Sequence, residues 1–314
     1  LGATFEKVTE KGNPIVDEAV LSTIDLPEAR SISEYLMLQK RNAQVNSWLE
    51  HVKEDSGRVH GQVISNGAVT GRMTHRNPNM AQIPSSNSPY GHECRSCWTV
   101  PEDKKLVGFD ASGLELRMLA HYMNDKEFTN VLLKEDVHTR NQVAAGLETR
   151  PQAKTFIYAF LYGAGDSKLG TIVGGSAKDG AKLKDRFLRN TPSLSTLRER
   201  VIRASGRGYI KGLDGRRLHV RSEHAALNTL LQAAGAIVMK KALVILDDYA
   251  TKWGLDYKFI GNVHDEVQTE VRAENADRFG WLAVECLKAA GLEFGLRCPL
   301  DGEYKIGTTW AETH

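Results

Sequence analysis

Two extended runs, each leading to an aspartate, are the feature that most constrains the fold of this chain. Lys105–Phe109 (KLVGF) is a short apolar run that enters Asp110. Tyr257–Val263 and Glu266–Val271 alternate in polarity around a tight turn, which predicts a β-hairpin with Asp265 at its tip. More than 150 residues separate the two aspartates. A sheet that holds both must therefore be assembled from distant parts of the chain.

Most of the rest of the sequence has helical periodicity. The breaks in that pattern fall at Gly146, at Gly163 to Gly165 and at Gly174-Gly175. A second hairpin is predicted over Tyr209–Val220, with its turn at Asp214-Gly215. The mixture indicates an α+β fold with an antiparallel sheet. The predicted helices are Ser31–Glu50 (capped by Ser33), Leu114–Met123, most of Val137–Arg203, His224–Lys252 and Asn275–Ala290, and the Gly-, Asn- and Pro-rich stretch Asn66–Gly91 is predicted to be a functional loop.

Composition limits the class of protein. The 314 residues are 41% hydrophobic and 25% charged, as in ordinary globular domains. No uninterrupted apolar stretch reaches about eighteen residues, and the start LGATFEKVTEKG lacks the features of a signal peptide. We therefore expect a soluble protein of the cytoplasm (the host cytoplasm if the source is viral) with no membrane partner. The first residue is Leu, so we expect a piece of a longer protein.

Charge is distributed unevenly along the chain. Lys134–Arg221 holds eighteen Lys or Arg against eight Asp or Glu, a net charge of +10, so the remainder carries −8. Such an asymmetry suits a protein that neutralises phosphates with one part and gathers carboxylates for metal ions in another. A solvated helical surface explains the basic segment equally well. The four cysteines are too few for a disulfide framework, and we expect them to be free thiols.

Asp110 and Asp265 are candidate ligands of divalent cations. Two carboxylates in one site repel each other unless cations lie between them, and Mg²⁺ prefers carboxylate, carbonyl and phosphate oxygens. A pair of such ions roughly 3.5–4 Å apart serves phosphoryl transfer. The commoner fate of a single Asp is that of a turn residue, so neither aspartate decides the function alone.

The most specific pattern is Arg150-x₃-Lys154-x₃-Tyr158-x₃-Tyr162-Gly163. Residues four apart drift by only about 40° around a helix, so the four side chains share one gently winding face. The end with the two cations also carries the helix dipole and suits a triphosphate, and the aromatic end suits a base. The alternative is that the tyrosines belong to the core and the cations to the surface. Core stripes do not usually place two cations in line with their aromatics, which favours a binding site.

With these patterns in place, the sequence resembles the family A DNA polymerases, the polymerase I family. The amino-acid sequence of these segments is most similar to that of the T-seven-like bacteriophage replicative DNA polymerases, and the resemblance runs from near Gly12 to the end. Its carriers are Asp110-Ala-Ser-Gly-Leu-Glu115-Leu-Arg117, the Arg150–Gly163 segment and Val263-His264-Asp265-Glu266, which look like motifs A, B and C, together with Thr70-Gly-Arg72, Pro78–Pro84 and Asn228-Thr-Leu-Leu-Gln232.

The resemblance implies a template-directed DNA polymerase that adds dNTPs to a primer 3′-hydroxyl and uses two Mg²⁺ ions, with Mn²⁺ expected to substitute. Lys154 would assist the leaving pyrophosphate, and Glu115, fixed by Tyr162, would exclude a 2′-hydroxyl. Tyr158 would pack on the incoming sugar and base. The implied metal ligands are Asp110, Asp265 and the carbonyl of Ala111. The implied nucleotide ligands are His138, Arg150, Lys154, Tyr158, Tyr162 and Glu115, the primer-template contacts are Arg72, Asn228, Gln232 and His264, and Glu266 has a supporting role.

The family's right-hand architecture implies a division of the chain. We expect a thumb remnant at 1–59, a first palm segment at 60–115, helical fingers at 116–211 and a second palm segment at 212–314. The exonuclease domain of the family would lie upstream, so no proofreading is expected from this chain. A processivity factor would bind through the upstream part of the thumb.

Three rival functions share some of these features. A single-subunit RNA polymerase would have both aspartates and the Arg-Lys helix, but Glu115 argues against an enzyme that needs a 2′-hydroxyl. A two-metal nuclease would use paired carboxylates without a triphosphate helix. A catalytically inactive DNA-binding module would keep only the basic surface.

Overall fold

The computed structural model describes residues 8–314, which form two compact units. Unit 1 contains the described residues up to Gln62 together with His75–Cys94, and unit 2 contains Val63–Thr74 and Arg95–His314. Residues 1–7 of the predicted thumb remnant lie outside the described residues. The thumb, palm and fingers boundaries stay predictions, because compactness alone does not define them.

Unit 1 is dominated by the helix α2, Pro27–Glu50. The prediction of a helix that begins with Ser33 as its cap was wrong, because α2 already begins at Pro27, a residue that fits a first helical turn. The chain passes between the units along β1 and β2, which pair with each other. The other elements between residues 8 and 96 are short. They are α1 (Glu18–Leu21), β1 (Gln62–Ile64), β2 (Thr74–Arg76), η1 (Met80–Gln82) and α3 (Gly91–Ser96).

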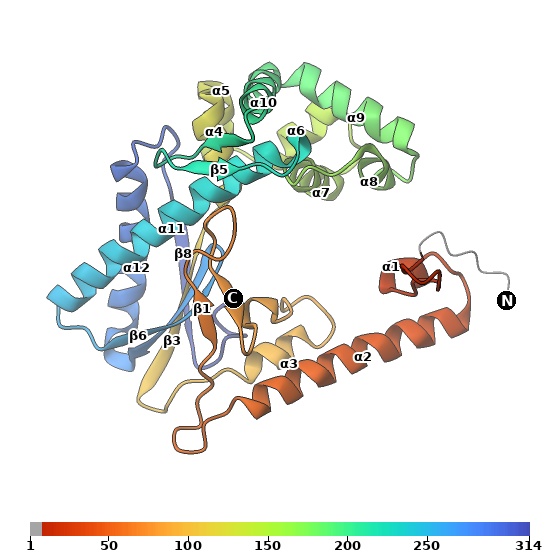
Figure 1. Cartoon of the computed structure of the whole chain (residues 1–314). Helices are drawn as coiled ribbons and strands as arrows, with labels where there is room; N and C mark the ends of the chain where they lie inside the picture. The colour runs from red at the N-terminus through yellow and green to blue at the C-terminus, as the bar shows by residue number, and fades with distance from the viewer. Residues whose placement is uncertain (1–7) are drawn as a thin grey trace. The chain divides into compact units, whose positions relative to one another are not determined.

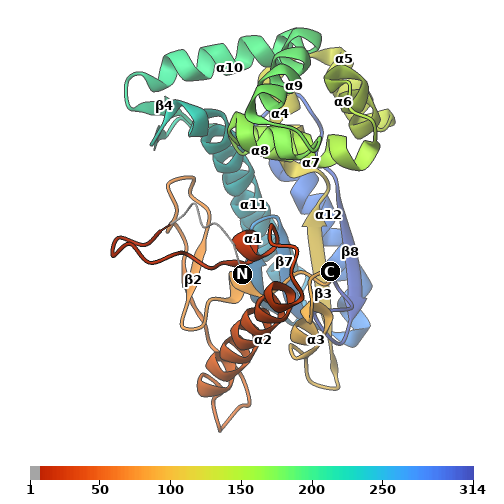
Figure 2. The ribbon, with the colours of Figure 1, turned by 90° about the vertical axis from the view of Figure 1, so that its right-hand side faces the viewer.

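Unit 2 is built on a four-stranded antiparallel sheet with the strand order β6-β7-β3-β8 (Figures 1 and 2). The inner strands are buried on both faces, so their hydrophobic residues specify the register strongly. In that register Asp110 lies opposite Glu266. The strands are β3 (Lys104–Ala111), β6 (Tyr257–Val263), β7 (Glu266–Arg272) and β8 (Gly302–Gly307), of which only β8 was not predicted.

Helices cover one face of this sheet, and the end of the chain covers the other. The helix α12 (Ala276–Glu293) packs on β3, β7 and β8, and α11 (Ala226–Lys252) packs on α12 (Figure 1). On the opposite face the Thr313 hydroxyl donates a hydrogen bond to Gln268 at 2.8 Å. A side chain at Gly108 would meet the Thr313 carbonyl oxygen at 2.5 Å, so only glycine allows this close approach.

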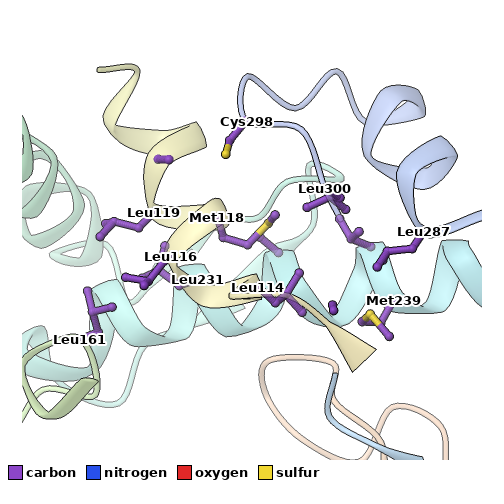
Figure 3. Close-up of a cluster of buried hydrophobic side chains, with 14 of the residues drawn as sticks. Leu114, Leu116, Met118, Leu119, Leu161, Leu231, Met239, Leu287, Cys298 and Leu300 are labelled. Atoms are coloured by element: carbon purple, nitrogen blue, oxygen red, sulfur yellow. The ribbon is translucent and has the colours of Figure 1, made fainter. Parts of the chain in front are cut away.

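Between β3 and β6 the chain of unit 2 is almost wholly helical, as predicted. α4 lies across α11, and its buried leucines pack on that helix near Leu231 (Figure 3). Leu114 of α4 comes close to Gly235 of α11, where an added Cβ would lie 3.0 Å from it. Before α11 these elements are α4 (Leu114–Met123), α5 (Lys126–Lys134), α6 (Val137–Ala145), α7 (Arg150–Leu161), α8 (Asp166–Thr171), α9 (Ala177–Asn190), α10 (Pro192–Ser205), the hairpin strands β4 (Tyr209–Lys211) and β5 (Arg217–His219), and η2 (Glu223–Ala225). The short η3 (Ala273–Asn275) lies later in the chain, between β7 and α12.

The segment Glu223–Lys252, which consists of η2 and α11, is long and apolar enough to cross a membrane by length and composition, with a mean hydropathy of 1.6. Polar residues such as Gln232 and Lys240 interrupt it, so no uninterrupted apolar stretch marks it in the sequence. However, 61% of its most apolar window is buried inside the protein, where it packs on α4 and α12. This burial is typical of a central core helix.

Candidate active site

Asp110 and Asp265 meet at one end of the sheet. Asp110 lies near the end of the inner strand β3, and Asp265 lies in the two-residue turn between β6 and β7. The N–H of Ala111 donates a hydrogen bond to the carbonyl oxygen of Asp265 at 3.2 Å, which ties the two segments together. His264 supplies the positive φ (63°) that so tight a hairpin turn requires. The structure thus brings the two predicted carboxylates to one place.

The electrostatics of this end of the sheet disfavour charged carboxylates. The side chain of Asp110 is reachable by solvent, but protein atoms surround much of it. This desolvation, followed by the negative charges of Asp265 and Glu266, raises the pKa of Asp110 to about 7. Burial and the charge of Glu115 likewise raise the pKa of Asp265. Such a site favours either protons or cations between the carboxylates.

Glu115, in the first turn of α4, is held from two sides. Arg72 Nη2 lies 3.1 Å from Glu115 Oε1, and both side chains are largely buried. The hydroxyl of Tyr162 donates a hydrogen bond to the same oxygen at 3.3 Å. The predicted link between Glu115 and Tyr162 is therefore present in the structure. The pairing of Glu115 with Arg72 was not predicted.

The helix α7 begins and ends as its sequence indicates. Thr149 caps the helix in a capping box with Gln152, and Pro151 lies in the first turn. The helix ends at Leu161, so Tyr162 is the C-cap residue. Gly163 follows with a φ of 76°. A side chain there would lie 2.6 Å from the carbonyl oxygen of His224, so glycine lets α7 end against the start of α11.

The aromatic residues predicted on α7 share one face. The rings of Tyr158 and Tyr162 stack with centroids 6.4 Å apart, and the ring of His138 lies 6.1 Å from that of Tyr158. Burial, then the negative charges of Glu115 and Asp265, raises the pKa of Tyr158, so its phenol lies within electrostatic reach of both carboxylates. The helix α7 therefore faces the end of the sheet where the aspartates meet.

The cations predicted on α7 lie at its solvent-exposed N-terminal end. Arg150 forms an ion pair with Asp136 through Nε, and its Nη2 lies 3.3 Å from the other carboxylate oxygen. Lys154 is exposed and makes no ion pair within residues 8–314. Burial and then the charge of Arg150 lower the pKa of His138, which favours the neutral form of its ring. An anion would find one unpaired ammonium and one guanidinium here.

The predicted primer-template residues come from three segments of unit 2. Asn228 and Gln232 lie one turn apart in α11 and are half-buried, while His264 is exposed in the hairpin turn. Arg72 reaches the site through its pairing with Glu115. What these residues bind stays a prediction.

Glu266 is a buried structural anchor. Its Oε1 accepts hydrogen bonds from Trp310 Nε1 and, at 2.8 Å, from Gln268 Nε2, and Arg95 Nη1 lies 3.5 Å away. His314 Nδ1 lies 2.9 Å from Oε2. Burial alone would raise the pKa of Glu266, but these hydrogen bonds outweigh it and lower the pKa. This surrounding fits the predicted supporting role.

The side chains of this site supply only part of the ligand set that a divalent cation needs. Within residues 8–314 no group of three or more His, Cys, Asp or Glu side chains lies where it could hold a metal ion. The raised pKa values show that cations would relieve the repulsion between Asp110 and Asp265. Carboxylates, a backbone carbonyl and substrate phosphates together make up the ligand set that Mg²⁺ usually takes. The predicted ligands therefore fit a metal that is completed by its substrate.

Comparisons with known proteins identify the family of the chain. The model of DNA polymerase family A matches residues 1–312. The chain belongs to DNA polymerase family A. The DNA-directed DNA polymerases of Enterobacteria phage T3 and Escherichia phage T7 are each 44% identical to it over 98% of the chain. The chain spans about half the length of these two relatives, 50% of each.

A solved structure supports the fold. The POL domain of Pol1 from M. smegmatis, in complex with DNA primer-template and dNTP, superposes with a TM-score of 0.89 at 23% identity. The match covers 100% of this chain and 59% of that one. The predicted α+β polymerase fold is therefore confirmed.

Besides the pairing of Glu115 with Arg72, two further features of the candidate site were not predicted from the sequence. Asp136 caps α6 and pairs with Arg150, and a signal was available in the helix-capping spacing of Asp136 to His138. The cluster around Glu266 involves Trp310 and His314, which lie 44 or more residues away. No local pattern in the sequence indicates that contact.

Proposed function

We propose that this family A chain carries DNA-directed DNA polymerase activity, in which a primer 3′-hydroxyl attacks the α-phosphorus of a dNTP. The observation that carries the proposal is the meeting of Asp110 and Asp265 at one end of the sheet, with Tyr158 and Tyr162 of α7 within electrostatic reach of Asp265. The T3 and T7 relatives, named as DNA-directed DNA polymerases, support it.

Asp110, Asp265 and the carbonyl of Ala111 would hold two Mg²⁺ ions. When bound, these ions supply charge neutralisation and a lowered pKa for the attacking hydroxyl. The other tasks belong to the side chains of this chain. Lys154, which has no ion-pair partner in residues 8–314, neutralises the leaving pyrophosphate. Arg150 binds the triphosphate through guanidinium donors that Asp136 does not occupy.

Glu115 selects the sugar. Arg72 and Tyr162 fix its carboxylate where it meets the 2′ position of the incoming nucleotide. A half-buried carboxylate held at both sides moves little, so a ribose hydroxyl at that place meets a steric block. The same fixation disfavours the RNA polymerase alternative.

Primer extension with Mg²⁺ and four dNTPs tests the proposal. The parent chain should extend a primer by copying the template, and Asp110→Asn or Asp265→Asn should reduce extension by far more than tenfold while DNA affinity changes little. Asp185→Asn, an exposed carboxylate of α9, is the matched control and should extend normally. Extension within tenfold of the parent by either site variant would refute the assignment of the two aspartates.

Three further measurements separate the rival functions. Extension with NTPs but not dNTPs would support an RNA polymerase. Metal-dependent shortening of a mismatched primer without dNTPs would support a nuclease and would contradict the proposed lack of proofreading. Binding of DNA with no change in primer length would support an inactive DNA-binding module.

A further inference from the structure

The β4–β5 hairpin carries a cationic surface that the proposed chemistry does not use. Ile210 and Leu218 pair across the hairpin and are buried, at 3% and 1% exposure. The neighbouring positions, which point the other way, are Tyr209 opposite His219 and Lys211 opposite Arg217. Lys211, Arg217 and His219 are exposed and Tyr209 is half-buried. The hairpin therefore has one core face and one face of cations and aromatics.

Two guanidinium groups lie against the single tyrosine ring of that face. The Cζ of Arg217 is 4.8 Å from the ring centroid of Tyr209, and the Cζ of Arg207, just before β4, is 5.4 Å from it. Within residues 8–314 none of Arg207, Lys211 and Arg217 forms an ion pair with a carboxylate. Lys211 and Arg217 are also like charges directly opposite each other, an arrangement that destabilises a hairpin by itself. This face of the hairpin therefore gathers three cations that have no carboxylate partner within residues 8–314, and an anionic ligand would relieve their mutual repulsion.

The hairpin is also joined to the candidate active site. It packs on α10 and on α11, the helix that carries Asn228 and Gln232. Arg216 Nη1 lies so close to Gly71 that an added Cβ would be 2.6 Å from it, and Gly71 precedes Arg72, the partner of Glu115. The tip of the hairpin therefore lies beside the segment that carries Arg72.

We propose that the outer face of the β4–β5 hairpin, with Arg207, Tyr209 and Arg217 at its centre, binds the single-stranded extension of the template. The identification of that strand as template rests on the proposed polymerase function. Guanidinium groups contact phosphates, and aromatic or guanidinium planes stack on bases, which is the usual chemistry of single-strand binding. An acidic polypeptide would use the charges but would gain nothing specific from the Tyr209 ring, so the observations favour nucleic acid.

Equilibrium binding to two primer-template duplexes tests the inference. The duplexes are identical except that one ends in a single unpaired template nucleotide and the other in about ten, a length within the site size of common single-strand binders. The longer extension should bind the parent chain more tightly. Arg207→Ala combined with Arg217→Ala should remove most of that gain, and should reduce the slope of log K against log[salt] by about 1.4 on the long-extension DNA, at about 0.7 per lost phosphate contact.

Three further variants separate stacking and local charge from general effects. Tyr209→Leu should weaken binding of the long extension by about tenfold, and Tyr209→Phe, which keeps the ring, should restore it. Lys178→Ala, which removes an exposed cation of α9, is the matched control and should keep the full gain. Equal losses for Lys178→Ala and the arginine variants would overturn the inference. So would a parent chain that gains nothing from the longer extension.

The remaining arms distinguish this inference from its neighbours. Single-nucleotide incorporation on the short-extension duplex should be unchanged in the hairpin variants. A parent chain that shows the extension-dependent gain but incorporates nothing would refute the polymerase proposal and leave the hairpin as a single-strand site. The last measurement uses polyglutamate. If the parent chain binds it, the arginine variants do not, and those variants still bind the long-extension DNA more tightly than the short-extension DNA, then the ligand is an acidic polypeptide and the inference is overturned.

Discussion

Replacing Asp110 by Asn should stabilise the metal-free protein while it abolishes the proposed activity. Desolvation and the charges of Asp265 and Glu266 raise the pKa of Asp110 to about 7, whereas an unfolded aspartate has a pKa of about 3.9. Between these values the folded state binds more protons than the unfolded state, so stability falls as the pH rises through this window. Below pH 4 the cost is absent, and above pH 7 it is fully present. Asn carries no such charge and escapes the cost.

The magnitude follows from the size of the shift. A difference of about 3 pKa units corresponds to about 4 kcal/mol, at about 1.36 kcal/mol per unit. Because the Asp110 side chain is solvent-accessible, screening reduces this to roughly 1–2 kcal/mol. The expected gain of Asp110→Asn at pH 8 is a rise in Tm of roughly 2–4 °C.

Thermal unfolding in EDTA between pH 5 and pH 8 measures this difference. The gain in Tm should be largest at pH 8 and should shrink towards pH 5, while the control Asp185→Asn should show no such dependence. Excess Mg²⁺ should then raise the Tm of the parent and not that of Asp110→Asn, because a cation relieves the repulsion only where both carboxylates are present. A gain that is independent of pH, or an equal effect of Mg²⁺ on both proteins, would refute the reasoning.

Three other substitutions have outcomes set by named contacts. Glu266→Ala leaves the buried guanidinium of Arg95 without its carboxylate and should lower the free energy of unfolding by about 3–5 kcal/mol in urea titrations, whereas a loss below about 1 kcal/mol would show that the cluster is not an anchor. Gly163→Ala places a Cβ 2.6 Å from a backbone carbonyl oxygen at a φ of 76°, so it should lower the free energy of unfolding by about 1–3 kcal/mol and raise the KM for dNTPs. Gly165→Ala, where nothing lies within 4 Å of the added Cβ, is the control and should change neither quantity. Tyr158→Phe should keep dNTP incorporation within a few-fold but reduce kcat/KM for dideoxynucleotides on the order of ten- to a hundredfold, because the hydroxyl supplies a donor in place of the absent 3′-hydroxyl, and an unchanged ratio would remove this residue from the nucleotide site.

Local patterns were sufficient wherever the chain interacts with its own neighbours in sequence. The hairpin tip at Asp265 and the break at Gly163 were both predicted, because turns depend on a few adjacent residues. The start predicted for α2 was wrong, since a helix capped by Ser33 would begin at Glu34, whereas α2 begins at Pro27, about two turns earlier. A polar residue inside a helix and one at its start look alike in sequence.

Contacts over long separations could not be obtained in this way. Nothing near Glu115 indicates that Arg72 pairs with it, and nothing near Glu266 points to Trp310. The strand β8 was missed for the same reason, because its six residues acquire their role only by pairing with β3. The family resemblance supplied the candidate site residues and the link between Glu115 and Tyr162, but it did not indicate that Arg72 holds the same carboxylate.

The stability of the site therefore comes from the sheet beneath it. Burial and the neighbouring carboxylates disfavour the charged state of both aspartates. If the two residues lay on mobile loops, this repulsion would move them apart. Here the backbone of Asp110 is paired on both sides, with β7 and with β8, and the residues before it in β3 are almost fully buried. Hydrophobic burial of these inner strands offsets the repulsion and keeps the carboxylates together. We infer that substitutions that loosen β3, such as Val107→Ala, lower cation affinity as well as stability, because separated carboxylates no longer need a cation between them.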